Sequence, residues 1–194
     1  MEKQELINLV REEWLKIQPE LMSLFAEQWD DPELPGMEEN SSKRLINWLE
    51  KNDFTVVRAP FNIPTAFIAN KRYMTSSPTI GILAEYDALP GLDNEAKIKR
   101  KSRGKIAGHG CGHNHIGPVN VGAAIVSSRV CKALKIPGEI SVIGCPAEEI
   151  LWGKIALFLN GAFSKLDCIL TSHGDYQNGA MSRPCQSVAA GEMI

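Results

Sequence analysis

The chain has 194 residues, of which 44% are hydrophobic and 23% are charged, so one domain of ordinary size with a sizeable core is expected. Its formal net charge of −2 argues against nucleic acid or an anionic membrane surface as the main partner, because phosphate groups favour a basic protein. No apolar run approaches the roughly 20 residues that span a bilayer, and the charged N-terminus lacks the apolar core of a signal peptide.

The first half of the chain is predicted to contain two helices followed by three strands. Apolar residues recur with helical spacing over 4–28 and again over 38–51, and a turn rich in proline and acidic residues separates the two segments. Segments 54–58 and 66–70 are predicted to be two strands that pair with each other. The run 79–84 is short and mostly apolar, which is typical of a central strand buried on both faces.

The second half alternates helices with strands, which predicts an α/β sheet with parallel pairs. Helices are expected over 115–134 and 154–163, and strands over 140–144 and 167–171, with one more strand beginning at 187–190. The basic cluster 97–105 is predicted to be a solvated, flexible loop; a patch for phosphate or an acidic substrate is the alternative.

The five cysteines are odd in number and widely spread, which does not fit a small disulfide scaffold. We therefore expect a reducing, cytoplasmic location. They occupy positions 111, 131, 145, 168 and 185.

Polar side chains that can bind a metal follow each of the three predicted buried strands. Glu85 and Asp87 follow the first, Glu148 and Glu149 follow the second, and His173 follows the third. Sites in open α/β sheets lie outside the carboxyl ends of the strands, so we expect these side chains to converge at one edge of the sheet.

The run 108–115 adds His109, Cys111, His113 and His115, with glycines between the first three of them. Thiolate and imidazole bind borderline-soft metals such as zinc, and glycine lets the backbone bring two ligands to one ion. A metal held by such ligands and carboxylates lowers the pKa of a bound water, and a carboxylate that does not bind the metal can take the proton. The adjacent pair Glu148-Glu149 suits this division, because neighbouring side chains diverge in an extended or turn segment.

Each residue alone also has a structural explanation. Cys111 could be a small buried hydrophobe, Glu148-Glu149 a solvated helix start, and His173 a satisfied residue at a strand end. A cysteine nucleophile at Cys111 with His113 as its base is a further alternative, although residues two apart rarely reach that geometry. The joint pattern at three strand ends favours the metal site.

Three blocks in order, 84–91, 108–114 and 146–149, resemble the signature blocks of the dinuclear metallo-amidohydrolases, a family that includes aminoacylases and glutamate carboxypeptidases. Within it the sequence is most similar to the aminobenzoyl-glutamate utilisation branch, which segments 31–33 and 38–39 also resemble. The resemblance covers roughly residues 25–175. It implies a zinc-peptidase-like catalytic domain of the α/β class, with a mixed, largely parallel sheet flanked by helices.

The resemblance also implies a role for each matching residue. Glu148 would be the general base, and Asp87 would orient a metal ligand, or tune its basicity, without binding the metal itself. Glu85 stands where other branches place a histidine ligand, so its role is open, whereas His109 and His115 would support the site without binding metal. The implied metal ligands are Cys111, which would bridge two ions, His113, Glu149 and His173.

Family members are about twice as long as this chain and carry an inserted lid domain that is used for dimerisation. We therefore expect 1–185 to be the N-terminal part of the catalytic domain, truncated before the lid, and 186–194 to begin the lid or a return strand. The family's last histidine ligand follows the lid, and all four histidines here lie at or before position 173. Gly174 also stands where a proline is more usual.

The resemblance implies a metal-dependent amidohydrolase, similar to carboxypeptidases, with two divalent ions: zinc or manganese, with cobalt as a further choice. The substrate would be a small-molecule amide: an N-acyl amino acid, aminobenzoyl-glutamate or a dipeptide-like compound. Neither nucleic acid nor membrane is expected as a partner, and full-length relatives are expected to be homodimers. The alternative is a non-catalytic metal-binding or interaction module, because the ligand shell of this fragment is incomplete.

Overall fold

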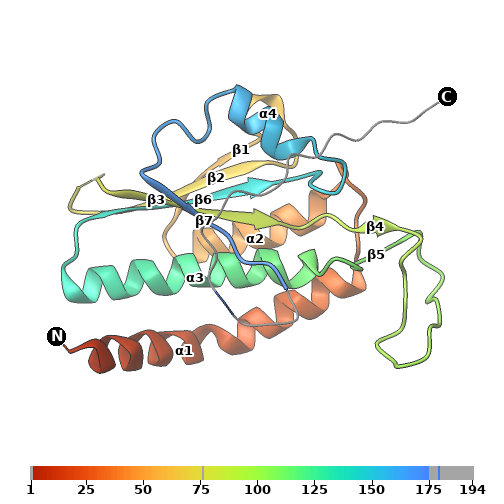
Figure 1. Ribbon diagram of the computed structural model, residues 1–194, viewed down its shortest axis with the longest axis horizontal. Helices are drawn as coiled ribbons and strands as arrows, with labels where there is room; N and C mark the ends of the chain where they lie inside the picture. Colours follow the sequence, from red (N-terminus) through yellow and green to blue (C-terminus); the bar gives the residue numbers. More distant parts are fainter. Residues whose placement is uncertain (1, 76, 175–178, 180–194) are drawn as a thin grey trace.

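The computed structural model describes residues 2–75, 77–174 and 179. In this part of the chain a five-stranded sheet has helices on both faces (Figure 1). Three helices lie on one face: α1 (Lys3–Asp30), α2 (Glu39–Lys51) and α3 (His113–Leu134). The short helix α4 (Gly153–Leu159) lies on the other face. The predicted strand at 187–190 and the segment 186–194 lie outside the described residues.

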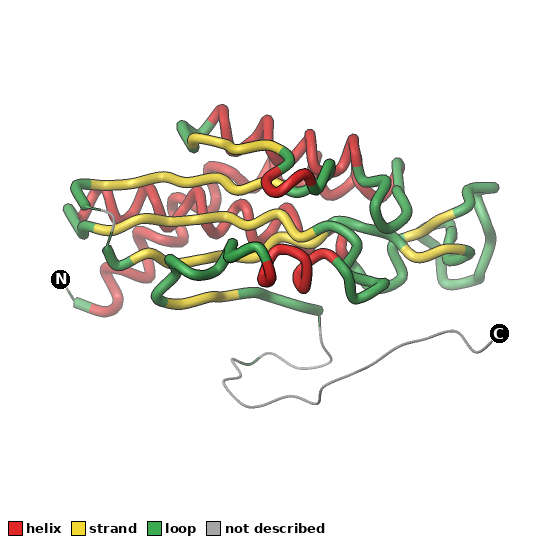
Figure 2. Tube along the Cα trace, turned by 90° about the horizontal axis from the view of Figure 1, so that it is seen from above, coloured by secondary structure: helices red, strands yellow, loops and turns green. Residues whose placement is uncertain are grey.

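The sheet is mixed, as expected. Strands β6, β3 and β7 run parallel to one another, whereas β1–β2 and β2–β6 are antiparallel pairs. The strands lie side by side (Figure 2), and in spatial order they are β1 (Thr55–Arg58), β2 (Phe67–Tyr73), β6 (Gly138–Cys145), β3 (Thr79–Glu85) and β7 (Cys168–Leu170).

Most of the helices and strands predicted from the apolar spacing begin and end within a few residues of the observed bounds. Helix α4 ends before the predicted position 163, because the chain turns at Asn160 and Gly161 with hydrogen bonds typical of a helix end. A second, two-stranded sheet of β4 (Leu89–Pro90) and β5 (Ala107–Gly108) and the 3-10 turn η1 (Pro60–Asn62) were not predicted.

The main core lies between the sheet and the helices α1, α2 and α3. Its largest buried members include Trp48 from α2, Phe67 from β2 and Ile125 from α3. Helix α3 packs directly on β3 and β6, and α1 covers the outer side of α3. A smaller core on the opposite face joins Ile143 of β6 to Leu157 of α4. The two cores fix both faces of the central parallel strands and so hold their carboxyl ends in place.

The basic segment is a loop, as predicted, but one of its arginines is anchored. The buried Asp93 carboxylate accepts hydrogen bonds from the side chains of Ser102 and Arg103 and from the backbone N–H of Lys105. The Arg103 guanidinium lies 5.0 Å from the centre of the Trp29 ring. Burial opposes ionisation of Asp93, but these hydrogen bonds hold its pKa well below the ordinary value. The loop is therefore tied to the end of α1 at Arg103.

No helix in the described part of the chain is both long enough and apolar enough to cross a membrane.

Candidate metal centre

The candidate site lies at the carboxyl ends of the three parallel strands. Strands β3 and β6 end side by side, with Glu85 directly opposite Cys145 in the register. The loop after β6 carries Glu148 and Glu149, and the chain after β7 carries His173. The start of α3 brings His113 to the same edge of the sheet. The convergence predicted from the strand ends is therefore confirmed.

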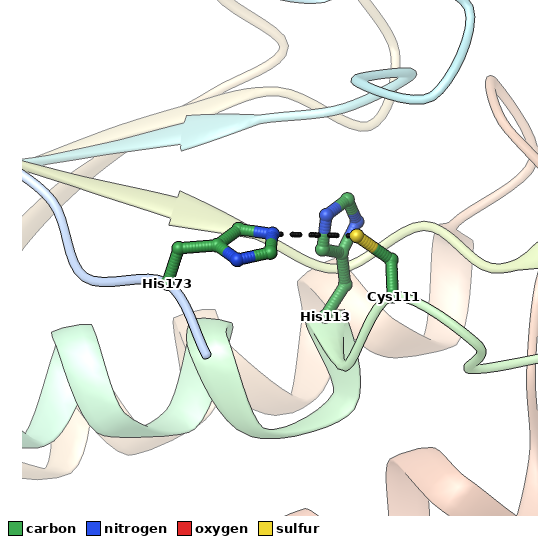
Figure 3. A group of neighbouring side chains, drawn as sticks. All are labelled: Cys111, His113 and His173. Atoms are coloured by element: carbon green, nitrogen blue, oxygen red, sulfur yellow. Dashed lines mark hydrogen bonds between the residues drawn. The ribbon is translucent and has the colours of Figure 1, made fainter. Parts of the chain in front are cut away.

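Cys111, His113 and His173 form the first group of metal-competent side chains (Figure 3). The Sγ atom of Cys111 lies 3.3 Å from Nε2 of His173, and the potential ligand atoms of all three residues lie within 4.8 Å of one another. Gly112 separates Cys111 from the helix and adopts a φ of +92°, which glycine tolerates and other residues rarely do. This turn lets both of its neighbours face the same centre.

Carboxylates form a second group around the same histidine. Nε2 of His113 lies 3.4 Å from Glu85, 3.8 Å from Glu148 and 3.9 Å from Glu149. Glu85, His113 and Glu148 have potential ligand atoms within 4.8 Å of one another. Glu85, whose role the resemblance left open, therefore has a buried carboxylate that belongs to the cluster.

Asp87 lies behind the cluster and contacts two of its members. Its Oδ1 is 2.9 Å from Nδ1 of His113, and its Oδ2 accepts a hydrogen bond from the backbone N–H of Glu149 at 2.9 Å. An ionised carboxylate can only accept, so Nδ1 of His113 carries the proton in this contact. In the neutral imidazole the free lone pair is then on Nε2, the atom that faces Glu85, Glu148 and Glu149.

The electrostatic environment favours a cation at this centre. Burial lowers the pKa of His113, but the hydrogen bond to Asp87 and the charges of Asp87, Glu85 and Glu149 outweigh it and raise the pKa above the ordinary value. Burial and the neighbouring Glu149 raise the pKa of the Cys111 thiol to about 11. In the metal-free chain Cys111 is therefore a protonated thiol near neutral pH, which disfavours the interpretation of this cysteine as a nucleophile.

The donor set fits a divalent metal ion. Nε2 of His113 and Oε1 of Glu149 are both buried, and neither has a hydrogen-bond partner among the described residues. Ligands bound at 2.0–2.3 Å to one zinc ion lie roughly 3 to 4 Å apart, which matches the spacings measured here. Thiol, imidazole and carboxylate are also the ligand types that zinc and similar ions take in proteins.

The two flanking histidines are placed differently. His109 is buried, and burial together with the charge of His113 lowers its pKa to about 4. Nδ1 of His115 lies 2.7 Å from the carbonyl oxygen of Gly112. Neither histidine belongs to a metal-competent group in the part of the chain that the structure describes.

Two residues of the site were not identified as members from the sequence. Nζ of Lys154 lies 2.6 Å from Glu85 Oε1 and 2.9 Å from Glu148 Oε1. The fully buried Glu38 accepts a hydrogen bond from the backbone N–H of Ala147, the residue before Glu148. The contacts Lys154–Glu85 and Glu38–Ala147 join segments that are remote in sequence, and a lone lysine or glutamate has no spacing signal that would reveal them.

Comparison with known proteins identifies relatives of the chain. No family model matches it. It is 38% identical over 147 residues to one of the subunits of p-aminobenzoyl-glutamate hydrolase from Escherichia coli (strain K12), a match that covers 75% of this chain and 30% of that protein. It is 32% identical over 166 residues to Xaa-Arg dipeptidase of Homo sapiens, covering 78% of this chain and 35% of that protein.

A solved structure shares the fold. A protein of Bacillus subtilis, described as a dinuclear metal binding peptidase from the M20 family, superposes with a TM-score of 0.72 at 24% identity, covering 82% of this chain and 44% of that chain. The chain spans about a third of the length of the two curated relatives described above. The ordered sequence blocks, the mixed sheet and these relatives agree, and the chain belongs to the dinuclear metallo-amidohydrolase family.

Proposed function

We propose that this chain provides the metal-binding and proton-transferring part of a metal-dependent amidohydrolase. The observation that carries the proposal is the position of Glu148 at the same centre as Cys111, His113 and His173. A carboxylate beside a metal-competent cluster is the arrangement that hydrolysis of an amide by activated water requires. Its neighbour Glu149 has a buried oxygen without a partner among the described residues, which suits a ligand.

The residues that would hold metal are those implied by the family resemblance: Cys111, His113, Glu149 and His173. Nε2 of His113 has one lone pair, so it can complete only one of the two overlapping groups. A second ion would need ligands other than His113, and Cys111 would supply its thiolate to the pair of ions, as the resemblance implies. Two divalent ions, of zinc or manganese with cobalt as a substitute, would supply an acidified water and positive charge for the substrate carbonyl oxygen.

The chain's own residues would carry the proton. The Oε2 atom of Glu148 lies 3.8 Å from Nε2 of His113, so a water molecule beside this histidine is within reach of the carboxylate. Glu148 would accept the proton of the attacking water and deliver it to the leaving amine. Asp87 would keep Nδ1 of His113 protonated and the ring oriented.

The substrate class is proposed from the family. Relatives are named for p-aminobenzoyl-glutamate, for Xaa-Arg dipeptides and for N-acetylcysteine, which share an amide that joins an acyl group to an amino acid. We propose the same bond, in an N-acyl amino acid, aminobenzoyl-glutamate or a dipeptide-like compound, as the bond that is cleaved.

The test uses the purified chain loaded with zinc, manganese or cobalt and assayed against these three substrate types. Glu148→Gln should lower turnover by roughly 10²- to 10⁴-fold while bound metal, measured by elemental analysis, stays unchanged. Glu139→Gln is the matched control, because Glu139 lies at the opposite end of β6 and pairs with Arg72. Turnover that survives Glu148→Gln would rule out Glu148 as the base.

One observation favours a second candidate, a non-catalytic metal-binding module. His173 is exposed, and the edge strand β7 that precedes it is exposed along its whole length, so the cluster is open on this side. Stoichiometric metal without turnover on any of the three substrate types would favour the module. A chain that binds no metal near neutral pH would contradict both proposals.

A further inference from the structure

Glu148 and Glu149 are adjacent in the sequence, yet their carboxylates have different partners. Oε1 of Glu148 lies 2.9 Å from Nζ of Lys154, in the first turn of α4. Among the described residues Glu149 has no lysine or arginine within ion-pair distance, and its Oε1 is buried without a hydrogen-bond partner. One ammonium group therefore distinguishes the two glutamates.

Lys154 is itself held by a third carboxylate. Its Nζ lies 2.6 Å from Oε1 of Glu85, whose side chain is only 6% exposed. The second oxygens of both carboxylates face the same histidine: Glu85 Oε2 is 3.4 Å and Glu148 Oε2 is 3.8 Å from Nε2 of His113. Lys154 thus binds one oxygen of each carboxylate, so Glu148 keeps one oxygen near the metal-competent centre, where it can accept a proton.

This contact changes what Glu148 can do. Two carboxylates so close together in a part-buried site repel each other unless a cation lies between them. An ammonium that holds one oxygen of a carboxylate fixes the whole group in place and neutralises part of its charge, so the group is a poorer metal ligand than a free carboxylate. A protonated lysine cannot itself bind the metal, so it orients the carboxylates without joining the ligand set.

We propose that Lys154, fixed by Glu85, is a positioning residue that keeps Glu148 out of the metal's ligand set and holds it as the proton acceptor. The assignment rests on the proposed function, because it explains why Glu148 acts as the base and Glu149 as the ligand. Without Lys154 the freed Glu148 carboxylate would turn to the metal and bind it as an additional ligand.

The test is a cobalt titration of the purified chain, because the visible absorption of cobalt weakens as ligands are added beyond a tetrahedral set. Lys154→Met should bind cobalt more tightly, by about tenfold, because it removes a positive charge and frees a carboxylate, and it should show weaker absorption per bound ion than the unaltered chain. Adding Glu148→Gln to Lys154→Met should restore both the affinity and the spectrum, since the extra ligand is gone. Lys154→Arg should resemble the unaltered chain, because its guanidinium can still bind both carboxylates.

Lys165→Met is the matched control, since Lys165 is an exposed lysine after α4 and outside the cluster. An unchanged affinity and spectrum in Lys154→Met, or a double variant that does not revert, would overturn the assignment. Should Lys154→Met unfold the chain by leaving Glu85 buried and unpaired, Lys154→Met with Glu85→Gln removes that charge and gives the same readout.

The cobalt readout needs no turnover, so the two proposals fail separately. A chain that binds cobalt and hydrolyses none of the substrates contradicts the proposed function, while its spectra still decide the role of Lys154. If turnover is observed, Lys154→Met should lower kcat with little change in KM, because the substrate contacts are untouched.

Discussion

At the scale of single residues, Asp87 links the two sides of the candidate site. One oxygen faces Nδ1 of His113 and the other accepts the backbone N–H of Glu149, both at 2.9 Å. The side chain is almost completely buried, so neither contact is weakened by competing water. Asp87 therefore fixes the tautomer of one proposed ligand and the backbone position of another.

We expect Asp87→Asn to weaken metal binding about 10- to 100-fold, the usual effect of losing a group that orients a ligand. The asparagine amide offers one acceptor and one donor, so either His113 or Glu149 would face an N–H group instead of an oxygen. Competition with a chelator measures the affinity. Asp53→Asn serves as the control, because the Asp53 side chain is 90% exposed, and equal affinities in the two variants would contradict the prediction.

Glu38 accepts hydrogen bonds that hold the segment before Glu148 in place. Its Oε1 accepts the backbone N–H groups of Gly36 and Ala147, and its Oε2 accepts the hydroxyl of Thr65. Ala147 has a φ of +52°, a left-handed conformation that costs energy for any residue other than glycine. The buried carboxylate therefore holds the strained residue that precedes Glu148.

Glu38→Ala should lower the free energy of unfolding by about 3 kcal/mol, because the two buried donors, the Ala147 N–H and the Thr65 hydroxyl, would lose their partner. Urea denaturation followed by circular dichroism measures the change. Glu39→Ala, which alters the next, exposed glutamate, should change stability by less than about 0.5 kcal/mol. If Glu38→Ala lowers the free energy of unfolding by no more than Glu39→Ala does, water must take over the hydrogen bonds of the missing carboxylate.

At the scale of elements, the approach of α3 to the end of β3 depends on Gly117. A Cβ atom added there would lie 2.7 Å from the carbonyl oxygen of Glu85 and 3.0 Å from Cδ1 of Leu45. The first of these atoms belongs to the backbone, so it cannot move aside as a side-chain end can. The glycine thus sets the distance between the helix that carries His113 and the strand that carries Glu85.

Gly117→Ala should lower the free energy of unfolding by about 1–3 kcal/mol through overpacking, although alanine has the higher helix propensity. Gly122→Ala on the same helix should cost less, because its Cβ would meet only the side chains of Leu21, Ile17 and Trp48, at 3.1–3.3 Å. The difference between the two urea midpoints tests the prediction. Equal losses of stability in the two variants would contradict the prediction, because α3 would then be able to shift and relieve the contact with Glu85.

The sequence predicts those elements whose residues carry a periodic pattern. The amphipathic spacing of 38–51 and the apolar run 79–84 indicate a helix and a buried strand, and the strand polarity then predicts that Glu85, Glu148 and His173 converge. The pair β4–β5 has two residues in each strand, too few for any periodicity. Lys154 has its partner Glu85 far away in the sequence, so only the folded chain reveals the contact.

At the scale of the whole molecule, the candidate site brings together loops from three different parts of the chain. Cys111 precedes α3, Glu149 follows β6, and His173 follows the exposed edge strand β7. A metal ion bound to all three would connect these loops to one another. The folded chain would bind a metal through this set, which the unfolded chain lacks, so the metal should stabilise the fold.

Zinc at about 100 times its Kd should add about 2.7 kcal/mol to the free energy of unfolding and raise Tm accordingly. The increment should grow from about pH 6 to about pH 8, because protons compete for the ligands. In the metal-free chain the pKa of His113 is raised above its ordinary value of 6.5, so its contribution to stability is complete below that value and is lost as pH rises through the folded pKa. The metal-free chain thus loses this contribution over the range in which metal binding strengthens.

Thermal scans with zinc or with a chelator, at three pH values across this range, measure the increment. Cys111→Ser with His173→Ala should abolish it, whereas Cys168→Ser should leave it intact, because Cys168 is an exposed cysteine on β7 outside the cluster. An increment that persists in the double variant would place the metal elsewhere. An increment that shrinks as pH rises would mean that zinc does not compete with protons for these side chains, and the candidate metal centre would then be wrong.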